Sequence, residues 1–196
     1  MPSHLGAANP EHGKLYARAA QATRKYVGGI RPDQWTLSTP CSEWNVRQVL
    51  NHLVSEAFWA VELFNGKTIA QVGKRFDGDL LGKDPLAAYG QSTKQAAQAM
   101  QAPSAMAATC HLSYGDVPGA VYAGHLFVDA LIHGWDIAKG AGQDTRLNVA
   151  LVKASWATVE PQLTGFQGSG VFGTPVLVAK NADLQTKLLG ALGRRP

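Results

Sequence analysis

Apolar residues recur at intervals of three and four along most of the chain, which is the spacing of residues on one face of an α-helix. Leu15, Ala19, Ala22 and Tyr26 illustrate this pattern near the N-terminus. The pattern predicts helices over residues 11–28, 46–64, 85–102, 118–138, 147–160 and 181–192. A chain with apolar positions arranged in this way is expected to be mainly all-α.

Cap and breaker residues place the ends of several of these helices. Asn45 precedes the second helix, and Gln48, three residues on, completes the pattern of a capping box. Pro85 suits the first turn of the third helix. Pro161 should stop or kink the helix predicted over 147–160, because proline removes a backbone donor.

Three stretches depart from the helical pattern. Residues 107–114 (AATCHLSY) predict a short strand that ends in a turn at Gly115-Asp116, and residues 176–179 (VLVA) can be extended. Residues 67–83 form a long connection between the second and third helices. Such a connection allows those two helices to run parallel rather than as an antiparallel hairpin.

The length and composition favour one domain with an appended tail. The chain has 196 residues, 45% of them hydrophobic, which is enough for a sizeable core. Four main helices with apolar faces fit a four-helix bundle. We assign the bundle to residues 1–165 and interpret residues 166–196 as a C-terminal extension packed on it.

Charge and cysteine content narrow the class of function. The 18 Lys and Arg residues against 14 Asp and Glu give a net charge of +4, and the basic residues are scattered, which argues against nucleic acid. No apolar run is long enough to span a membrane, and the first residues lack the apolar core of a secretory signal. Two cysteines are too few for a disulfide framework, so a cytoplasmic location is expected. A homodimer stays open, since the core alone accounts for helices this apolar.

The most apolar predicted helix also carries groups that can bind a metal. His125, Asp129 and His133 are spaced four apart in HLFVDALIHGWD and therefore lie in one line along the helix. Burying unpaired polar groups costs free energy, and a bundle core can offset that cost by binding a metal between facing helices. The second helix offers His52 near its apolar face, with Glu56 one turn further on.

If the second and fourth helices face each other, His52 could meet Asp129 and His133 around one ion. Imidazole and carboxylate ligands suit Zn²⁺, Ni²⁺ or Fe²⁺, and three protein ligands leave a position open for substrate, as in catalytic sites. His125 lies about 12 Å from His133 along the helix axis, too far to share that ion, so it is a candidate pocket or outer residue. The alternative is a polar core without metal, in which Asp129 pairs with His125 or His133.

Several neighbouring residues have two interpretations each. Glu56 could be a fourth ligand or a general base, or simply a hydrogen-bonded glutamate. Arg47 could contact an anionic substrate, or donate to Asp136 instead. Trp44 is expected to pack against the start of the second helix, as aromatic anchors commonly do. Cys41 precedes that helix, where the helix dipole could lower a thiol pKa, but the preferred interpretation is a small buried cysteine.

Two long motifs and the tail carry a resemblance to a known family. TPCSEWNVRQVLNHL, residues 39–53, resembles a stretch of the DinB-like superfamily in its mycothiol-dependent maleylpyruvate isomerase N-terminal branch. DALIHGWDIAKGAGQD, residues 129–144, resembles the second signature of that branch. The segment 170–196 is similar to the tail of an actinobacterial-type subfamily described only as metal-binding. The resemblance covers nearly the whole chain.

The resemblance implies a DinB-like four-helix bundle in which His52, Asp129 and His133 hold a divalent transition metal, zinc first and nickel or iron as alternatives. The isomerase has Glu at the position of Asp129, one methylene longer. Similar proteins include thiol S-transferases that use mycothiol or bacillithiol, and hydrolase-like proteins. The resemblance therefore implies a metal-dependent transferase whose partners are a small-molecule thiol and an electrophilic substrate. A metal-dependent hydrolase and a non-catalytic metal-binding bundle are the alternatives.

Overall fold

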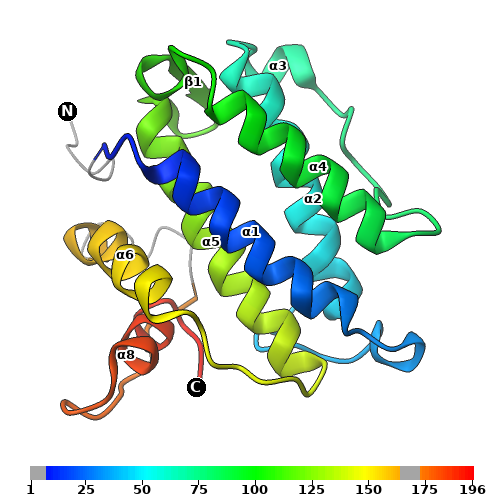
Figure 1. Cartoon of the computed structure of the whole chain (residues 1–196), viewed down its shortest axis with the longest axis vertical. Helices are drawn as coiled ribbons and strands as arrows, with labels where there is room; N and C mark the ends of the chain where they lie inside the picture. Colours follow the sequence, from blue (N-terminus) through cyan, green and yellow to red (C-terminus); the bar gives the residue numbers. More distant parts are fainter. Residues whose placement is uncertain (1–7, 164–172) are drawn as a thin grey trace.

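A computed structural model of the chain describes residues 8–163 and 173–196 (Figure 1). Within these residues the long helices are α1 (His12–Gly28), α2 (Val46–Phe64), α4 (Pro85–Met100) and α5 (Gly119–Gly140). Figure 1 shows α2 and α4 running in one direction along the bundle and α1 and α5 in the other. The connection between α2 and α4 returns the chain along the bundle and contains one short helix, α3 (Ile69–Val72). The predicted four-helix bundle and its long connection are confirmed.

The predicted capping box at the start of α2 is present. The Asn45 side chain accepts a hydrogen bond of 2.9 Å from the Gln48 backbone N–H, and the Gln48 side chain accepts one of 2.9 Å from the Asn45 N–H. Asp84 caps α4 in a similar way through the Ala87 N–H, with Pro85 in the first turn. These caps satisfy backbone donors that a helix start leaves free, so both helices begin where the sequence predicts.

A β-hairpin joins α4 to α5, and here one prediction was wrong. The strands are β1 (Thr109–Leu112) and β2 (Gly115–Pro118), which pair antiparallel. The turn lies at residues 113–114, so Gly115 and Asp116 belong to a second strand that the sequence did not predict. The register explains this placement, because Asp116 lies opposite His111 and their side chains hydrogen-bond at 2.8 Å.

The C-terminal part of the described chain packs on the bundle. It contains α6 (Val149–Val159), a 3₁₀ turn (Glu160–Gln162) and α8 (Leu184–Ala191). Leu188, Leu189 and Leu192 belong to the same buried cluster as residues of α1, α2 and α5. Residues 176–179 (VLVA) belong to no helix or paired strand, and the Val176 N–H donates to the Gly190 carbonyl. The predicted boundary at residues 165 and 166 lies outside the described residues.

Helix α5 is buried along almost its whole length. Its residues that are not fully buried are His125, Asp129, and Lys139 and Gly140 at its C-terminal end. His125 and Asp129 are thus polar positions that face open space inside an otherwise covered helix. None of the helices in residues 8–163 and 173–196 combines the length and apolarity needed to cross a membrane.

Close packing between α1 and α5 fixes the rotation of α5. A side chain at Gly134 would overlap the Thr23 hydroxyl, which donates a hydrogen bond of 2.9 Å to the Ala130 carbonyl. At Gly124, a Cβ atom would lie 2.6 Å from the His12 ring. At 3.6 residues per turn, these glycines and Asp129 occupy opposite sides of α5. Packing against α1 therefore turns Asp129 toward α2.

Substituting Gly134 with Ala should lower the free energy of unfolding by about 1–3 kcal/mol, the usual cost of overpacking a filled core. The added methyl group would overlap the Thr23 hydroxyl, and α1 would have to move. Urea unfolding of both proteins measures the difference. Gly28→Ala is the matched control, because its Cβ would meet no atom closer than 3.9 Å, and it should cause no loss. Equal losses in both variants would contradict the close approach of α1 and α5.

Candidate metal centre

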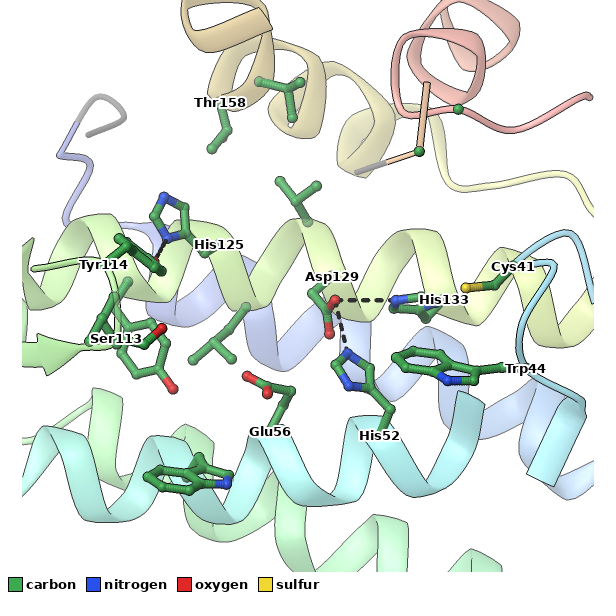
Figure 2. A pocket seen from close by; sticks show the side chains of 18 of the residues that line it. Cys41, Trp44, His52, Glu56, Ser113, Tyr114, His125, Asp129, His133 and Thr158 are labelled. Carbon is green, nitrogen blue, oxygen red and sulfur yellow. Dashed lines mark hydrogen bonds and ion pairs between the residues drawn. The ribbon is translucent and has the colours of Figure 1, made fainter. Parts of the chain in front are cut away.

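Three side chains from two helices converge at the middle of the bundle (Figure 2). Asp129 Oδ1 lies 3.3 Å from His52 Nε2 and 3.4 Å from His133 Nε2. One such atom from each residue lies within 4.8 Å of the other two. A tetrahedral zinc ion with bonds of 2.0–2.2 Å would hold its ligand atoms about 3.3–3.6 Å apart. The donor set and its spacing therefore fit a divalent metal.

Trp44 forms one wall of this cluster. Its ring centroid lies 4.7 Å from that of His52 and 5.7 Å from that of His133. The loop before α2 holds the tryptophan in place, since the Thr39 hydroxyl donates to the Trp44 carbonyl at 2.8 Å. Trp44 was expected only to pack against the start of α2, and its contact with both imidazoles was not predicted.

A chain of hydrogen bonds fixes the orientation of His133. Its Nδ1 lies 2.9 Å from Asp136 Oδ2 and donates its proton to that carboxylate. Nε2 is therefore the ring nitrogen on the side of Asp129, where a metal would bind. Asp136 is fully buried and also accepts hydrogen bonds of 2.8 and 3.3 Å from the Arg194 guanidinium. Burial alone would raise the pKa of Asp136, but His133 and Arg194 hold it below its ordinary value. A histidine that binds a metal through one ring nitrogen commonly donates a hydrogen bond from the other to a carboxylate, which fixes its orientation.

The predicted pairing of Arg47 with Asp136 was wrong. Arg47 neither donates to Asp136 nor lines the pocket, because its guanidinium binds Asp79 at the surface, with a closest distance of 2.8 Å. Of the two partners left open for Asp129, His133 lies 3.4 Å away, whereas His125 is turned to the Tyr114 hydroxyl, 2.8 Å from its Nδ1. In both cases the partner comes from a connection or turn whose position the helical spacing does not determine.

Charges within the cluster reinforce one another. Burial opposes ionisation of Asp129, but His52 and His133 outweigh it and bring the pKa of Asp129 down to about 2. Burial likewise opposes protonation of His52, yet the charge of Asp129 prevails and raises the His52 pKa. Burial and the Asp129 charge raise the pKa of Glu56 to about 7, with His52 acting against them. Glu56 can therefore exchange a proton near neutral pH.

A pocket of about 910 Å³ opens beside the cluster. His125 and Glu56 line it together with His52, Asp129 and His133. Figure 2 shows Glu56 on α2 one turn from His52, pointing into the same space. Glu56 is not part of the group of donor atoms that lie within 4.8 Å of one another. Its position suits proton transfer better than metal binding.

Cys41 lies on the other side of His133. Its sulfur forms a second group with His133 and Asp136 in which the donor atoms also lie within 4.8 Å. Asp136 is already paired with Arg194, so a cation at this second group would face the guanidinium. Burial raises the pKa of the Cys41 thiol, although Arg194 partly opposes the shift. The lowered thiol pKa considered for Cys41 is therefore wrong.

Arg194 and Tyr114 are two polar lining residues that the sequence did not predict. Arg194 lies in the C-terminal tail, and only 7% of it is exposed. Tyr114 lies in the hairpin turn and reaches back to α5. Neither residue falls in a periodic segment, and their positions depend on how the tail and the hairpin pack against α5.

A helical bundle that brings two histidines and an aspartate together beside a pocket defines a DinB-like protein. The chain belongs to the mycothiol maleylpyruvate isomerase N-terminal domain family, whose sequence model matches residues 16–138. The matched region extends from α1 through most of α5 and includes His52, Asp129 and His133.

The chain is also similar to two mycobacterial proteins of undescribed function. These are the uncharacterised proteins Rv0738 and MT0763 of Mycobacterium tuberculosis, from strains H37Rv and CDC 1551. Each is 32% identical over 158 residues, which cover 76% of this chain and 80% of the relative. No solved structure matches the chain.

Substituting Asp129 with Asn should lower the pKa of His52 in chelator-treated protein below its ordinary value, because burial then acts without the neighbouring charge. A proton NMR titration of the His52 ring measures this. With Asp129 in place, the interaction stabilises the protein below the ordinary histidine pKa, and that stabilisation is lost as pH rises through the raised pKa. Asp33→Asn, an exposed substitution, serves as the control. An unchanged His52 titration in Asp129→Asn would exclude the assigned cause.

Proposed function

We propose that His52, Asp129 and His133 hold one divalent transition metal, zinc first and nickel or iron as alternatives. We further propose that the protein is a metal-dependent transferase that acts with a low-molecular-weight thiol of the mycothiol or bacillithiol type. The main support is the triangle of donor atoms, with distances of 3.3 and 3.4 Å from Asp129, at the wall of a pocket of about 910 Å³. Three protein ligands beside such a space leave a coordination position for a small molecule.

In the proposed reaction the metal ion would activate the thiol, and side chains of the protein would accept its proton and orient the ligands. A divalent ion at this position would lower the pKa of a bound thiol and so supply a nucleophile near neutral pH. Glu56, whose pKa is raised to about 7, is suited to take up the thiol proton. Asp136 accepts a hydrogen bond from His133 Nδ1 and so leaves Nε2 as the ring nitrogen that would bind the ion. The family description names mycothiol, which supports a thiol as the cosubstrate.

Purified wild-type protein should carry about one equivalent of a transition metal, as expected for a single site. His52→Ala and His133→Ala should each lose it, because each removes one of three ligands. Elemental analysis measures the metal, and circular dichroism checks the fold. His111→Ala is the matched control, since His111 lies on the hairpin and pairs with Asp116 rather than facing the pocket. Metal-free wild-type protein that also fails to take up zinc would overturn the metal site.

Thiol binding tests the transferase separately. Calorimetric titration of mycothiol, bacillithiol and glutathione into zinc-loaded and chelator-treated protein compares the two states. Binding of at least one thiol should require the metal. If the loaded protein binds none of them, the transferase proposal fails even where the metal site stands.

Asp136→Asn should weaken zinc binding by about 10- to 100-fold, because the partner behind His133 loses its charge. Competition with a chromogenic chelator measures the affinity. Asp79→Asn is the matched control, since it removes the surface partner of Arg47 and should leave zinc binding unchanged. Equal zinc affinities in Asp136→Asn and wild type would show that Asp136 does not support the ligand.

A metal-dependent hydrolase is the second candidate, and the position of Glu56 favours it. A buried glutamate with a pKa near 7 beside the proposed metal is suited to act as a general base toward water. Turnover of an ester or amide panel without thiol, lost in Glu56→Gln, would support this function. Product formation only with thiol would support the transferase. The large pocket speaks against a purely structural metal, whose site would be closed.

A further inference from the structure

The pocket extends past the proposed metal ligands to a second polar position at His125. His125 lies four residues before Asp129 on α5, about 6 Å away along the helix axis. Its Nδ1 lies 2.8 Å from the Tyr114 hydroxyl. Figure 2 shows the ring between Tyr114 and the side of the pocket where Thr158 lies. The His125 ring is therefore held in one orientation at a distance from the metal cluster.

The partner of Nδ1 determines what the other ring nitrogen offers. A phenol is the better donor and an imidazole nitrogen the better acceptor, so Tyr114 donates to Nδ1. Burial raises the pKa of Tyr114, which keeps the hydroxyl protonated. Burial and the nearby His12 lower the pKa of His125 to about 4, so its ring is neutral. His125 consequently carries its single proton on Nε2.

This Nε2–H is buried, and no acceptor in residues 8–163 and 173–196 lies within hydrogen-bonding distance. Gln162, which also lines the pocket, has a similar feature. Its side-chain nitrogen donates to the Thr158 carbonyl at 2.7 Å, while its carbonyl oxygen is buried and receives no donor from the same described residues. Buried polar groups are nearly always hydrogen-bonded, so two such atoms on lining residues of one pocket point to a ligand with neutral polar groups.

The charges around the pocket argue against an anionic ligand. Its acidic lining residues are Glu43, Glu56 and Asp129, and Arg194 is the one Lys or Arg among the described lining residues. Arg194 is neutralised by Asp136 at 2.8 Å. The stretches 1–7 and 164–172 contain neither Lys nor Arg. A substrate with two carboxylates, such as the maleylpyruvate in the family description, would find no free side-chain cation there.

Most of the remaining wall is apolar. It includes Trp59, Leu63, Leu112, Tyr122, Leu126 and Val159. We infer that this part of the pocket binds an uncharged, mainly apolar electrophile that bears a carbonyl group, and that His125 Nε2–H donates to that carbonyl. The inference deepens the proposed function and rests on it, because it names the class of molecule that the thiol would attack.

Cinnamamide and cinnamate are suitable probes, because they share one apolar skeleton and nearly one shape but differ in charge. Each is titrated calorimetrically into the chelator-treated full-length chain, so that no metal attracts the carboxylate. Cinnamamide should bind about tenfold more tightly than cinnamate. His125→Leu should weaken cinnamamide binding by about tenfold, the upper range for one neutral hydrogen bond. His111→Leu, the same substitution on the hairpin, should leave binding unchanged.

His125→Gln provides a second variant that retains a side-chain N–H donor, and it should keep part of the cinnamamide affinity. Equal binding of the two probes to wild type, no binding of either, or equal cinnamamide binding in His125→Leu and wild type would each overturn the inference. The result is separable from the metal site. Selective, His125-dependent binding in a protein that takes up no metal would support this subsite while removing the proposed metal function.

Discussion

The buried carboxylate of Asp129 is the constraint on which the rest of the site depends. A charge taken out of water is costly unless it is paired, and here two imidazoles from different helices meet the same oxygen atom. Bringing them there requires α5 to be turned by its contact with α1 and His52 to be presented by α2. Helices α2 and α5 thus supply the central residues, and the contact with α1 sets the rotation that brings them together.

Around this carboxylate the pocket separates into two electrostatic regions. At one end, ionised Asp129 and the buried pair of Asp136 and Arg194 concentrate the charge. At the other, His125 and Tyr114 form a neutral hydrogen-bonded pair among apolar walls. A protein that joins a thiol to an electrophile needs both regions, because the thiolate requires a cation and an uncharged electrophile requires an apolar surface.

Periodicity predicted most of the fold and the grouping of the central residues. The bundle helices follow their apolar spacing, and Asn45 with Gln48 predicted where α2 begins. Asp129 and His133 could be grouped because a helix places residues four apart on one face. His52 joined them only on the condition that its helix faces theirs, and through the family resemblance. The same rules failed for Gly115 and Asp116, whose turn-like character was outweighed by cross-strand pairing. Arg194 could not be predicted either, since its contact with Asp136 spans 58 residues of sequence.

The contact between Arg194 and Asp136 has a consequence for the order of assembly. His133 receives its full support only after α8 has docked and delivered Arg194 to the base of α5. The helices α2 and α5 supply the central residues, but the support of His133 is completed by a residue that follows Asp136 by 58 positions in the sequence. Damage to the C-terminal tail that carries Arg194 would therefore lower metal occupancy of the proposed centre, although the tail supplies none of its ligands.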